Sequence, residues 1–295
     1  MSDLVTDART ILVTGASGVL GRRLLPLLRQ AGWRTRCLVH DRAVAGSDEV
    51  VRGDLADPAS LRVALDSVDA VIHLAAATHV RKASVYAAVN VEGTRALLAA
   101  APATVRRFVH VSTRAIASDG GAYSRSKLRA EEAVRDAALP WVIVRPGEVF
   151  GGRAGGAGVD DIVDRARRGR PILVVAGGEQ EVCPVHIDDV LPVLVRAVSS
   201  PEAVGQTFSL FGECMSVREF ATRASAAFES SSRIVSVPRN VVAALSALSR
   251  YVPLPLYPDQ LASLEAAKAP AVGDAGKDLG FAPRRLELAL LDVPR

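Results

Sequence analysis

The chain has 295 residues, of which 49% are hydrophobic, 23% charged and 4% aromatic, and its formal net charge is +4. This length can bury a full core and allows one large α/β unit, alone or with a smaller lobe. No apolar run approaches the roughly 18 residues of a membrane span, and no basic run carries interleaved aromatic residues, so we expect neither a membrane nor a nucleic acid as partner.

The N-terminus and the cysteines bear on the compartment. Residues 1–10 include acidic side chains and no apolar segment, so they do not resemble a signal peptide, and we expect a cytoplasmic protein. Cys37, Cys183 and Cys214 are odd in number and lack the paired spacing of metal ligands. We therefore expect buried or incidental thiols in a reducing compartment, and no structural metal.

Residues 10–33 predict a strand, a tight turn and a helix. The run Thr10–Thr14 is β-branched and aliphatic, glycines follow at every third position, and apolar residues then recur at helical spacing. Glycines let the backbone approach a pyrophosphate, and the N–H groups at the helix start attract its negative charge. We predict that a dinucleotide contacts Gly15, Ser17, Gly18, Val19, Leu20 and Gly21.

The turn, VTGASGVLG, resembles the short-chain dehydrogenase/reductase superfamily, particularly its extended branch of nucleotide-sugar epimerases, dehydratases and related reductases. The resemblance implies an NAD(P) cofactor on an α/β fold, a doubly wound parallel sheet of the Rossmann type, with a smaller discontinuous C-terminal lobe for the substrate. We accordingly expect the dinucleotide-binding domain at residues 1–150 and about 181–212, and the substrate lobe at residues 151–180 and about 213–295.

The second predicted strand, Trp33–Val39, leads to the residues expected beside the adenosine ribose. Basic side chains there bind the 2′-phosphate of NADP, whereas an acidic side chain accepts hydrogen bonds from the ribose hydroxyls of NAD. His40 and Arg42 favour NADP(H), but Asp41 lies between them and leaves NAD open.

A third strand, Glu49–Gly53, is followed by Asp54 and Leu55. The resemblance places the Asp54 carboxylate at the adenine amino group and Leu55 over the ring, although a solvated loop aspartate is the plain alternative. The next residues, Asp57 and Pro58, have the pattern of a helix N-cap and first position.

The fourth predicted strand, Val68–Leu74, ends in the sequence HLAAAT. In the family a loop of small residues passes under the ribose on the nicotinamide side, which makes Leu74, Ala75 and Ala76 candidate contacts. We expect His73 to pack at the strand end rather than to act in catalysis. The following N-x-x-G-T segment implies that Asn90 supports the site.

Tyr123 and Lys127 are the strongest catalytic candidates. Positions i and i+4 share one face of a helix, and an ammonium beside a phenol favours the phenolate, so we expect a Tyr123 pKa lowered from about 10 towards neutrality. Such a tyrosine can exchange a proton with an oxygen while a hydride moves at the attached carbon. The fifth strand, Arg107–Ser112, would bring Thr113 to orient that oxygen, with Ser112 as the alternative.

The family pattern breaks in the loop between Thr113 and Tyr123. The loop, RAIASDGGA, is shorter than in nucleotide-sugar members. Arg114 and Ala115 follow the threonine, where sugar 4,6-dehydratases carry an Asp-Glu pair. We therefore disfavour 4,6-dehydration.

After a sixth strand, Pro140–Val144, the run Arg145–Gly152 resembles the family's R-P-x-x-V-[FY]-G element beside the nicotinamide carboxamide, so Pro146 and Gly147 are candidate cofactor contacts. We interpret residues 151–158 as a glycine-rich hinge or lid.

The sequence Val185–Val190 resembles the family's V-H-V-D-D-V element, where the chain returns to the sheet and starts a helix. We expect Asp188 to cap that helix or to support the site from behind, and His186 to pack.

The sequence thus favours an NAD(P)-dependent oxidoreductase acting on a small-molecule secondary alcohol or ketone, most simply by ketone reduction, with a lean towards NADP(H). Epimerisation and a redox-neutral cyclisation or rearrangement can use the same residues. A dinucleotide-binding sensor or assembly subunit without turnover is the rival of another class, but such proteins commonly lose the tyrosine or the lysine. Relatives often form homodimers through the helix that bears both residues. The fold does not name a substrate.

Overall fold

The computed structural model describes residues 9–152, 158–249, 251 and 260–293. Its centre is a seven-stranded parallel sheet with the strand order β11-β6-β5-β4-β1-β2-β3. The order runs outwards in both directions from the first strand, which confirms the doubly wound fold. The strands are β1 (Thr10–Thr14), β2 (Arg34–Val39), β3 (Glu49–Arg52), β4 (Ala70–His73), β5 (Arg107–Val111), β6 (Trp141–Pro146) and β11 (Gln206–Leu210).

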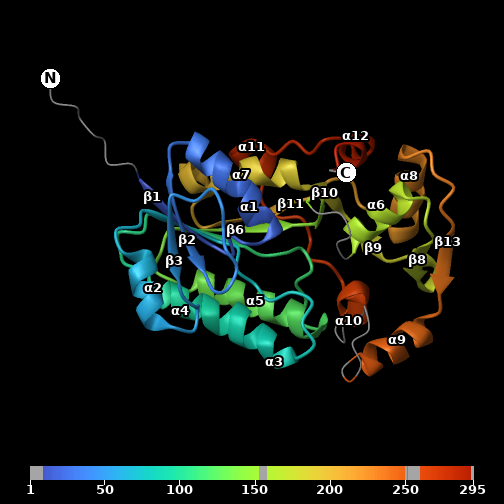
Figure 1. The fold of residues 1–295 in the computed structure, drawn as a ribbon, viewed down its shortest axis with the longest axis horizontal. Coiled ribbons are helices and arrows are strands. Elements are labelled where there is room, and N and C mark those ends of the chain that lie inside the picture. The colour runs from blue at the N-terminus through green and yellow to red at the C-terminus, as the bar shows by residue number, and fades with distance from the viewer. Residues whose placement is uncertain (1–8, 153–157, 250, 252–259, 294–295) are drawn as a thin grey trace.

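Helices cover both faces of this sheet, which explains why its central strands are continuous apolar runs. One face carries α1 (Val19–Gln30), α7 (Ile187–Ser199) and α11 (Ala275–Leu279), and the other carries α2 (Pro58–Leu65), α4 (Gly93–Ala100) and α5 (Gly121–Arg135) (Figure 1).

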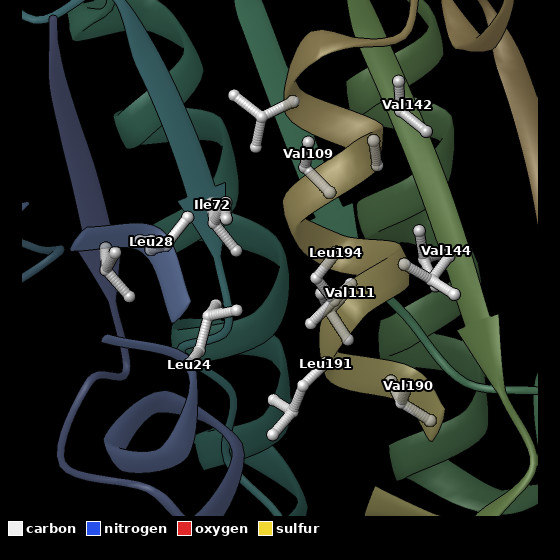
Figure 2. Close-up of a cluster of buried hydrophobic side chains, with 14 of the residues drawn as sticks. Leu24, Leu28, Ile72, Val109, Val111, Val142, Val144, Val190, Leu191 and Leu194 are labelled. Carbon is white, nitrogen blue, oxygen red and sulfur yellow. The ribbon is translucent and has the colours of Figure 1, made fainter. Parts of the chain in front are cut away.

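The core on the first face lies between α1, α7 and the strands. Figure 2 shows side chains of both helices directed at the same layer of strand residues. The labelled members of this layer are Leu24 and Leu28 from α1, Val190, Leu191 and Leu194 from α7, and Ile72, Val109, Val111, Val142 and Val144 from the strands.

The segment before α4 is helical but irregular. The short helix α3 (Ala83–Tyr86) continues into a π-helical turn, η1 (Ala87–Glu92), which runs directly into α4. A π turn widens the helix by one residue and is frequent at functional sites. Asn90 lies in this turn.

A second core lies beside the sheet's carboxyl edge, formed mainly by α6, α8 and the small strands. Its elements are α6 (Val159–Arg167), β8 (Ile172–Val175), η2 (Ala176–Gly178), β9 (Glu181–Val182), β12 (Met215–Ser216), α8 (Val217–Ala227), β13 (Ile234–Val237) and α12 (Leu286–Leu291). The remaining elements are β7 (Glu148–Phe150), which pairs with β10 (Pro184–His186), and η3 (Pro201–Ala203), α9 (Arg239–Leu248) and α10 (Gln260–Glu265).

We propose the two-part division at residues 1–150 with 181–212 and 151–180 with 213–295. The helix α11 belongs to the second range in sequence, yet Ala275 and Leu279 pack into the core of the sheet. Within the described residues, none of the helices is long and apolar enough to cross a membrane. Of the predicted glycine-rich hinge, residues 153–157 lie outside the described part of the chain.

One of the two alternatives for Asp188 is excluded, and one expectation for the cysteines is wrong. The N-cap of α7 is His186, whose ring nitrogen Nδ1 accepts from the Asp188 backbone N–H at 3.3 Å, so Asp188 is not the cap. Cys183 and Cys214 form a disulfide rather than remaining separate thiols. They meet because β9 and β12 pair antiparallel, which brings their Cα atoms to 4.1 Å. Cys37 is a buried free thiol, and burial raises its pKa to about 11.

Candidate functional site

The glycine turn between β1 and α1 has the shape of a phosphate cradle. Gly15 has a φ of +70°, and a Cβ there would lie 2.5 Å from the backbone nitrogen of Ala75. A Cβ on Gly21 would lie 2.5 Å from the Cα of Ala16, so glycine sets how closely α1 approaches the strand. Gly18 is the N-cap of α1 and supplies no side-chain acceptor, which leaves the first N–H groups open to an anion. These residues therefore fit the pyrophosphate of a dinucleotide.

The loop after β2 holds His40 between two carboxylates. Its Nδ1 lies 2.7 Å from Asp41 and its Nε2 lies 3.2 Å from Asp54. Arg42 is exposed beside them. Asp54 also accepts from the backbone N–H of Ala56 at 2.7 Å. Both ring nitrogens of His40, which the sequence suggested for a 2′-phosphate, thus face carboxylates, whereas Arg42 is an exposed cation beside them.

The apolar residue predicted over the adenine ring, Leu55, is almost fully buried. It lies against Gly93 at the start of α4, where a Cβ would come within 3.0 Å of the Leu55 side chain, closer than ordinary van der Waals contact. Leu55 also belongs to the core under the second helical layer.

His73 packs at the end of β4, as predicted. Its Nδ1 lies 2.7 Å from the hydroxyl of Thr14 and its Nε2 lies 2.9 Å from the hydroxyl of Thr94. Burial lowers the pKa of His73 to about 3, with a further contribution from the Lys127 charge, so the ring is neutral. Thr14 also accepts from the backbone N–H of Ala75 at 3.3 Å and thereby fixes the loop of Leu74, Ala75 and Ala76 below the glycine turn.

The helix α5 brings Tyr123 next to Thr113, which follows β5. The Thr113 hydroxyl lies near enough to the phenol to lower its pKa. The ring of Tyr86 packs edge-on against Tyr123 with 5.7 Å between centroids. Burial raises the pKa of Tyr123 to about 12, and the nearby Thr113 hydroxyl only partly offsets this. The expectation of a lowered pKa is therefore wrong for this structure, because the loss of water around the phenol outweighs its polar partners.

Lys127 is buried one turn further along α5 and does not hydrogen-bond to Tyr123 in this structure. Its Nζ donates to the backbone oxygen of Val111 at 2.9 Å. Burial lowers the pKa of Lys127 to about 8, although Glu131 raises it. The ammonium therefore faces the last carbonyl of β5, at the sheet edge where open α/β folds bind ligands.

A buried ion-pair network lies behind Lys127. Glu131 is fully buried and accepts from Arg145 at 2.9 and 2.6 Å and from Arg135 at 2.7 Å. Burial raises the pKa of Glu131, but the arginine hydrogen bonds outweigh it, so the net pKa is lowered. The network joins α5 to β6 and fixes the helix that carries the candidate residues.

Asn90 supports the site from the π turn. Its side chain accepts from the Ala77 backbone N–H at 2.7 Å and donates to the Ser126 hydroxyl at 2.9 Å. Ser126 in turn donates to the backbone oxygen of Tyr123 at 2.7 Å. The supporting role of Asn90 agrees with the sequence analysis, whereas Ser126 and Tyr86 carried no recognisable signal.

The predicted nicotinamide-side element continues from β6. Pro146 accepts from the backbone N–H of Arg114 at 2.9 Å, and Gly147 donates to the backbone oxygen of Leu210 at 2.9 Å. These bonds place Pro146 and Gly147 between the ends of β5 and β11. Arg23 of α1 donates to the backbone oxygen of Gly151 at 2.9 Å, which holds the end of this element over the start of α1.

The comparisons with known proteins agree with this geometry. The model of the NAD dependent epimerase/dehydratase family matches residues 11–210. A ceramide reductase from Caulobacter vibrioides is 34% identical over 206 residues, which are 67% of this chain and 64% of that relative. A 4-hydroxy-2-methyl-3-oxo-4-farnesyl-3,4-dihydroquinoline-1-oxide ketoreductase from Stigmatella aurantiaca is 30% identical over 237 residues, which are 71% of this chain and 70% of that relative.

The fold likewise has solved counterparts. The structure of UDP-glucuronic acid 4-epimerase from Bacillus cereus, in complex with UDP-glucuronic acid and NAD, is similar with a TM-score of 0.74. The similarity covers 96% of this chain and 97% of that chain at 20% sequence identity. Together with the sequence matches, it assigns this chain to the NAD-dependent epimerase/dehydratase family of the extended short-chain dehydrogenase/reductase superfamily.

Proposed function

We propose that this chain is an NADP(H)-dependent reductase of a small-molecule ketone. The observation that carries the proposal is the placement of Tyr123 beside Thr113, with Lys127 buried one turn further along α5 and bonded to the last carbonyl of β5. A bound nicotinamide would supply or accept the hydride. The curated relatives named as a reductase and a ketoreductase support the direction of the reaction.

The protein's own groups can handle the substrate oxygen. Because burial raises the pKa of Tyr123 to about 12, the phenol is protonated at neutral pH and is suited to donate to a carbonyl oxygen. The Thr113 hydroxyl, which lies beside Tyr123, would donate a hydrogen bond to the same substrate oxygen and orient it. Lys127 would hold the nicotinamide ribose hydroxyls and assist proton transfer by its charge.

The cofactor preference is part of the proposal. Arg42 is exposed in the loop after β2, where we expect a 2′-phosphate to bind, and Arg22 is exposed on the first turn of α1. Asp41 acts against NADP(H) binding, because its carboxylate lies in the same loop, 2.7 Å from His40, and would repel a 2′-phosphate. The lean towards NADP(H) rests on the arginines.

Epimerisation is the second candidate function. The fold-level similarity to a UDP-glucuronic acid 4-epimerase supports it, and it needs the same three side chains with a transient ketone.

The test begins with fluorescence titration of the purified protein with NADPH and NADH, followed by a screen of ketones with the cofactor that binds. Tyr123→Phe should lower turnover by about 10²–10⁴-fold and leave cofactor affinity nearly unchanged. Tyr86→Phe is the control, because it keeps the ring that packs against Tyr123. Equal turnover of Tyr123→Phe and the unmodified protein would remove the acid/base assignment, and binding of neither cofactor would favour a protein without turnover.

A further inference from the structure

A cluster of charged side chains lies beside the candidate catalytic residues, at the carboxyl ends of the sheet strands. Arg114 directly follows Thr113 after β5, and Phe211 directly follows β11. The guanidinium carbon of Arg114 lies 4.8 Å from the centre of the Phe211 ring. The opposite partner, Glu181, comes from β9, so the cluster joins the sheet to the smaller part of the molecule.

Arg114 is buried with only part of its hydrogen-bonding capacity used. The residue is 8% exposed, and its Nη2 donates to Glu181 Oε1 at 2.6 Å. Its Nε and Nη1 are buried and have no hydrogen-bond partner among the described residues. Buried charged donors are nearly always paired, so an unpaired guanidinium next to a ligand site points to a group that arrives from outside.

A second cation reinforces the positive charge of Arg114. Lys268 is partly buried and its Nζ donates to the backbone oxygen of Ser263 at 2.5 Å. Burial lowers the pKa of Lys268 and the Arg114 charge lowers it further, whereas Glu148 and Glu181 raise it. The backbone N–H of Ala269, the residue after Lys268, donates to the backbone oxygen of Arg114 at 3.0 Å, so the two cations lie on adjacent segments of the chain.

The two acids of the cluster are held differently. Glu148 accepts from the backbone N–H of Cys183 at 2.8 Å and lies in a short strand, so it is fixed. The Glu181 side chain is 53% exposed, so it can move from Arg114 into water without further burial changes.

We propose that Arg114 and Lys268 form a subsite for an anionic group of the substrate, a carboxylate or a phosphate, and that Glu181 occupies the Arg114 end until the anion replaces it. The inference deepens the proposed function and rests on it, because it assigns a charge to the substrate of the same cleft. The incoming anion takes over Nη2 from Glu181 and gains the neighbouring Nε or Nη1, a charge-assisted contact that neutral substrates cannot make.

Calorimetric titration of the NADPH-loaded protein with inorganic phosphate, and separately with succinate, tests the subsite. Glu181→Gln should bind one of these anions about fivefold or more tightly than the unmodified protein, because the competing carboxylate is gone. Arg114→Gln should bind it at least about tenfold more weakly, and Lys268→Gln should weaken it in the same direction. Asp161→Asn is the matched control, because it removes an acid 2.7 Å from Arg165 on α6 and should change nothing.

Whether phosphate or succinate binds more tightly shows whether the subsite takes a phosphate or a carboxylate of the substrate. Unchanged affinity in Glu181→Gln would overturn the displacement, and unchanged affinity in both cation variants, or failure of both anions to bind, would overturn the subsite. If Arg114→Gln does not fold, the anion affinities of Lys268→Gln and Glu181→Gln test the subsite in its place. Cofactor loading is read first by nicotinamide fluorescence. Its failure would count against the proposed function alone, because the variants can still be compared without cofactor.

Discussion

Replacing Lys127 by methionine should stabilise the folded protein while it impairs activity. Burial lowers the pKa of Lys127 from 10.5 to about 8, which at 1.36 kcal/mol per pKa unit means that the folded state carries a penalty of about 3 kcal/mol for the ammonium at neutral pH. Methionine removes the charge but also the hydrogen bond to Val111, which contributes about 1 kcal/mol. We therefore expect Lys127→Met to raise the free energy of unfolding by about 2 kcal/mol at pH 7.

The stability that Lys127→Met gains over the unmodified protein should fall as the pH rises. Between about pH 8 and 10.5 the unfolded chain binds a proton at Lys127 that the folded protein has released, so the stability of the unmodified protein rises with pH in this window. The methionine variant lacks this titration. Its advantage should therefore be full below pH 8, should vanish before pH 10.5 and should give way above that pH to a deficit of about 1 kcal/mol, because only the lost hydrogen bond then remains.

Urea unfolding of both proteins at several pH values from 7 to 10.5 measures the difference directly, and taking the difference cancels other groups that titrate there. A variant that is less stable at pH 7, or an advantage that does not change with pH, would refute the assigned penalty. The same variant should lose cofactor affinity and turnover. Full activity would show that the buried charge serves no function in this cleft.

The other predictions concern the cofactor cradle and the buried network. Gly15→Ala should abolish dinucleotide binding in a fluorescence titration, whereas Gly32→Ala, which has a similar positive φ but open space around it, should only lower stability; equal binding by both would refute the steric argument. Glu131→Gln should lower the free energy of unfolding by about 3–5 kcal/mol in denaturant, because it breaks a buried ion pair, while the exposed neighbour variant Glu132→Gln should change it by less than about 0.5 kcal/mol. Asp41→Asn should raise NADPH affinity relative to NADH affinity, and an unchanged ratio would contradict the charge argument at the ribose.

The parts of the fold that depend on local pattern were predictable from the sequence. The strand-turn-helix at Gly15, the positions of the strands along the chain and the helical spacing of Tyr123 and Lys127 all follow from neighbouring residues, and the structure has each of these elements. The cap at Asp57 was equally local, since its carboxylate accepts from the N–H groups of Ala59 at 3.0 Å and Ser60 at 3.2 Å. The roles of the candidate residues in binding and catalysis stay predictions.

The features that escaped prediction depend on contacts between distant segments. The pairing of Cys183 with Cys214 requires two strands of only two residues each, which have no periodicity to detect. The pKa of Tyr123 is a balance between burial and polar partners, and the sequence shows the partners but not the burial. In the sequence, Arg114 stands out only as a departure from a dehydratase pattern. That its Nε and Nη1 lack hydrogen-bond partners among the described residues depends on how three strand ends pack together.

The order in which the sheet is covered has a consequence for synthesis of the chain. One face of β4, β5 and β6 is shielded by α7, whose Val190, Leu191 and Leu194 are made more than 40 residues after β6 ends at Pro146 (Figure 2). At about 5–20 residues per second, a ribosome needs several seconds to add that helix. During this interval the nascent chain exposes a strip of aliphatic strand residues with no internal cover. Chaperone capture during translation should therefore be strongest before α7 emerges.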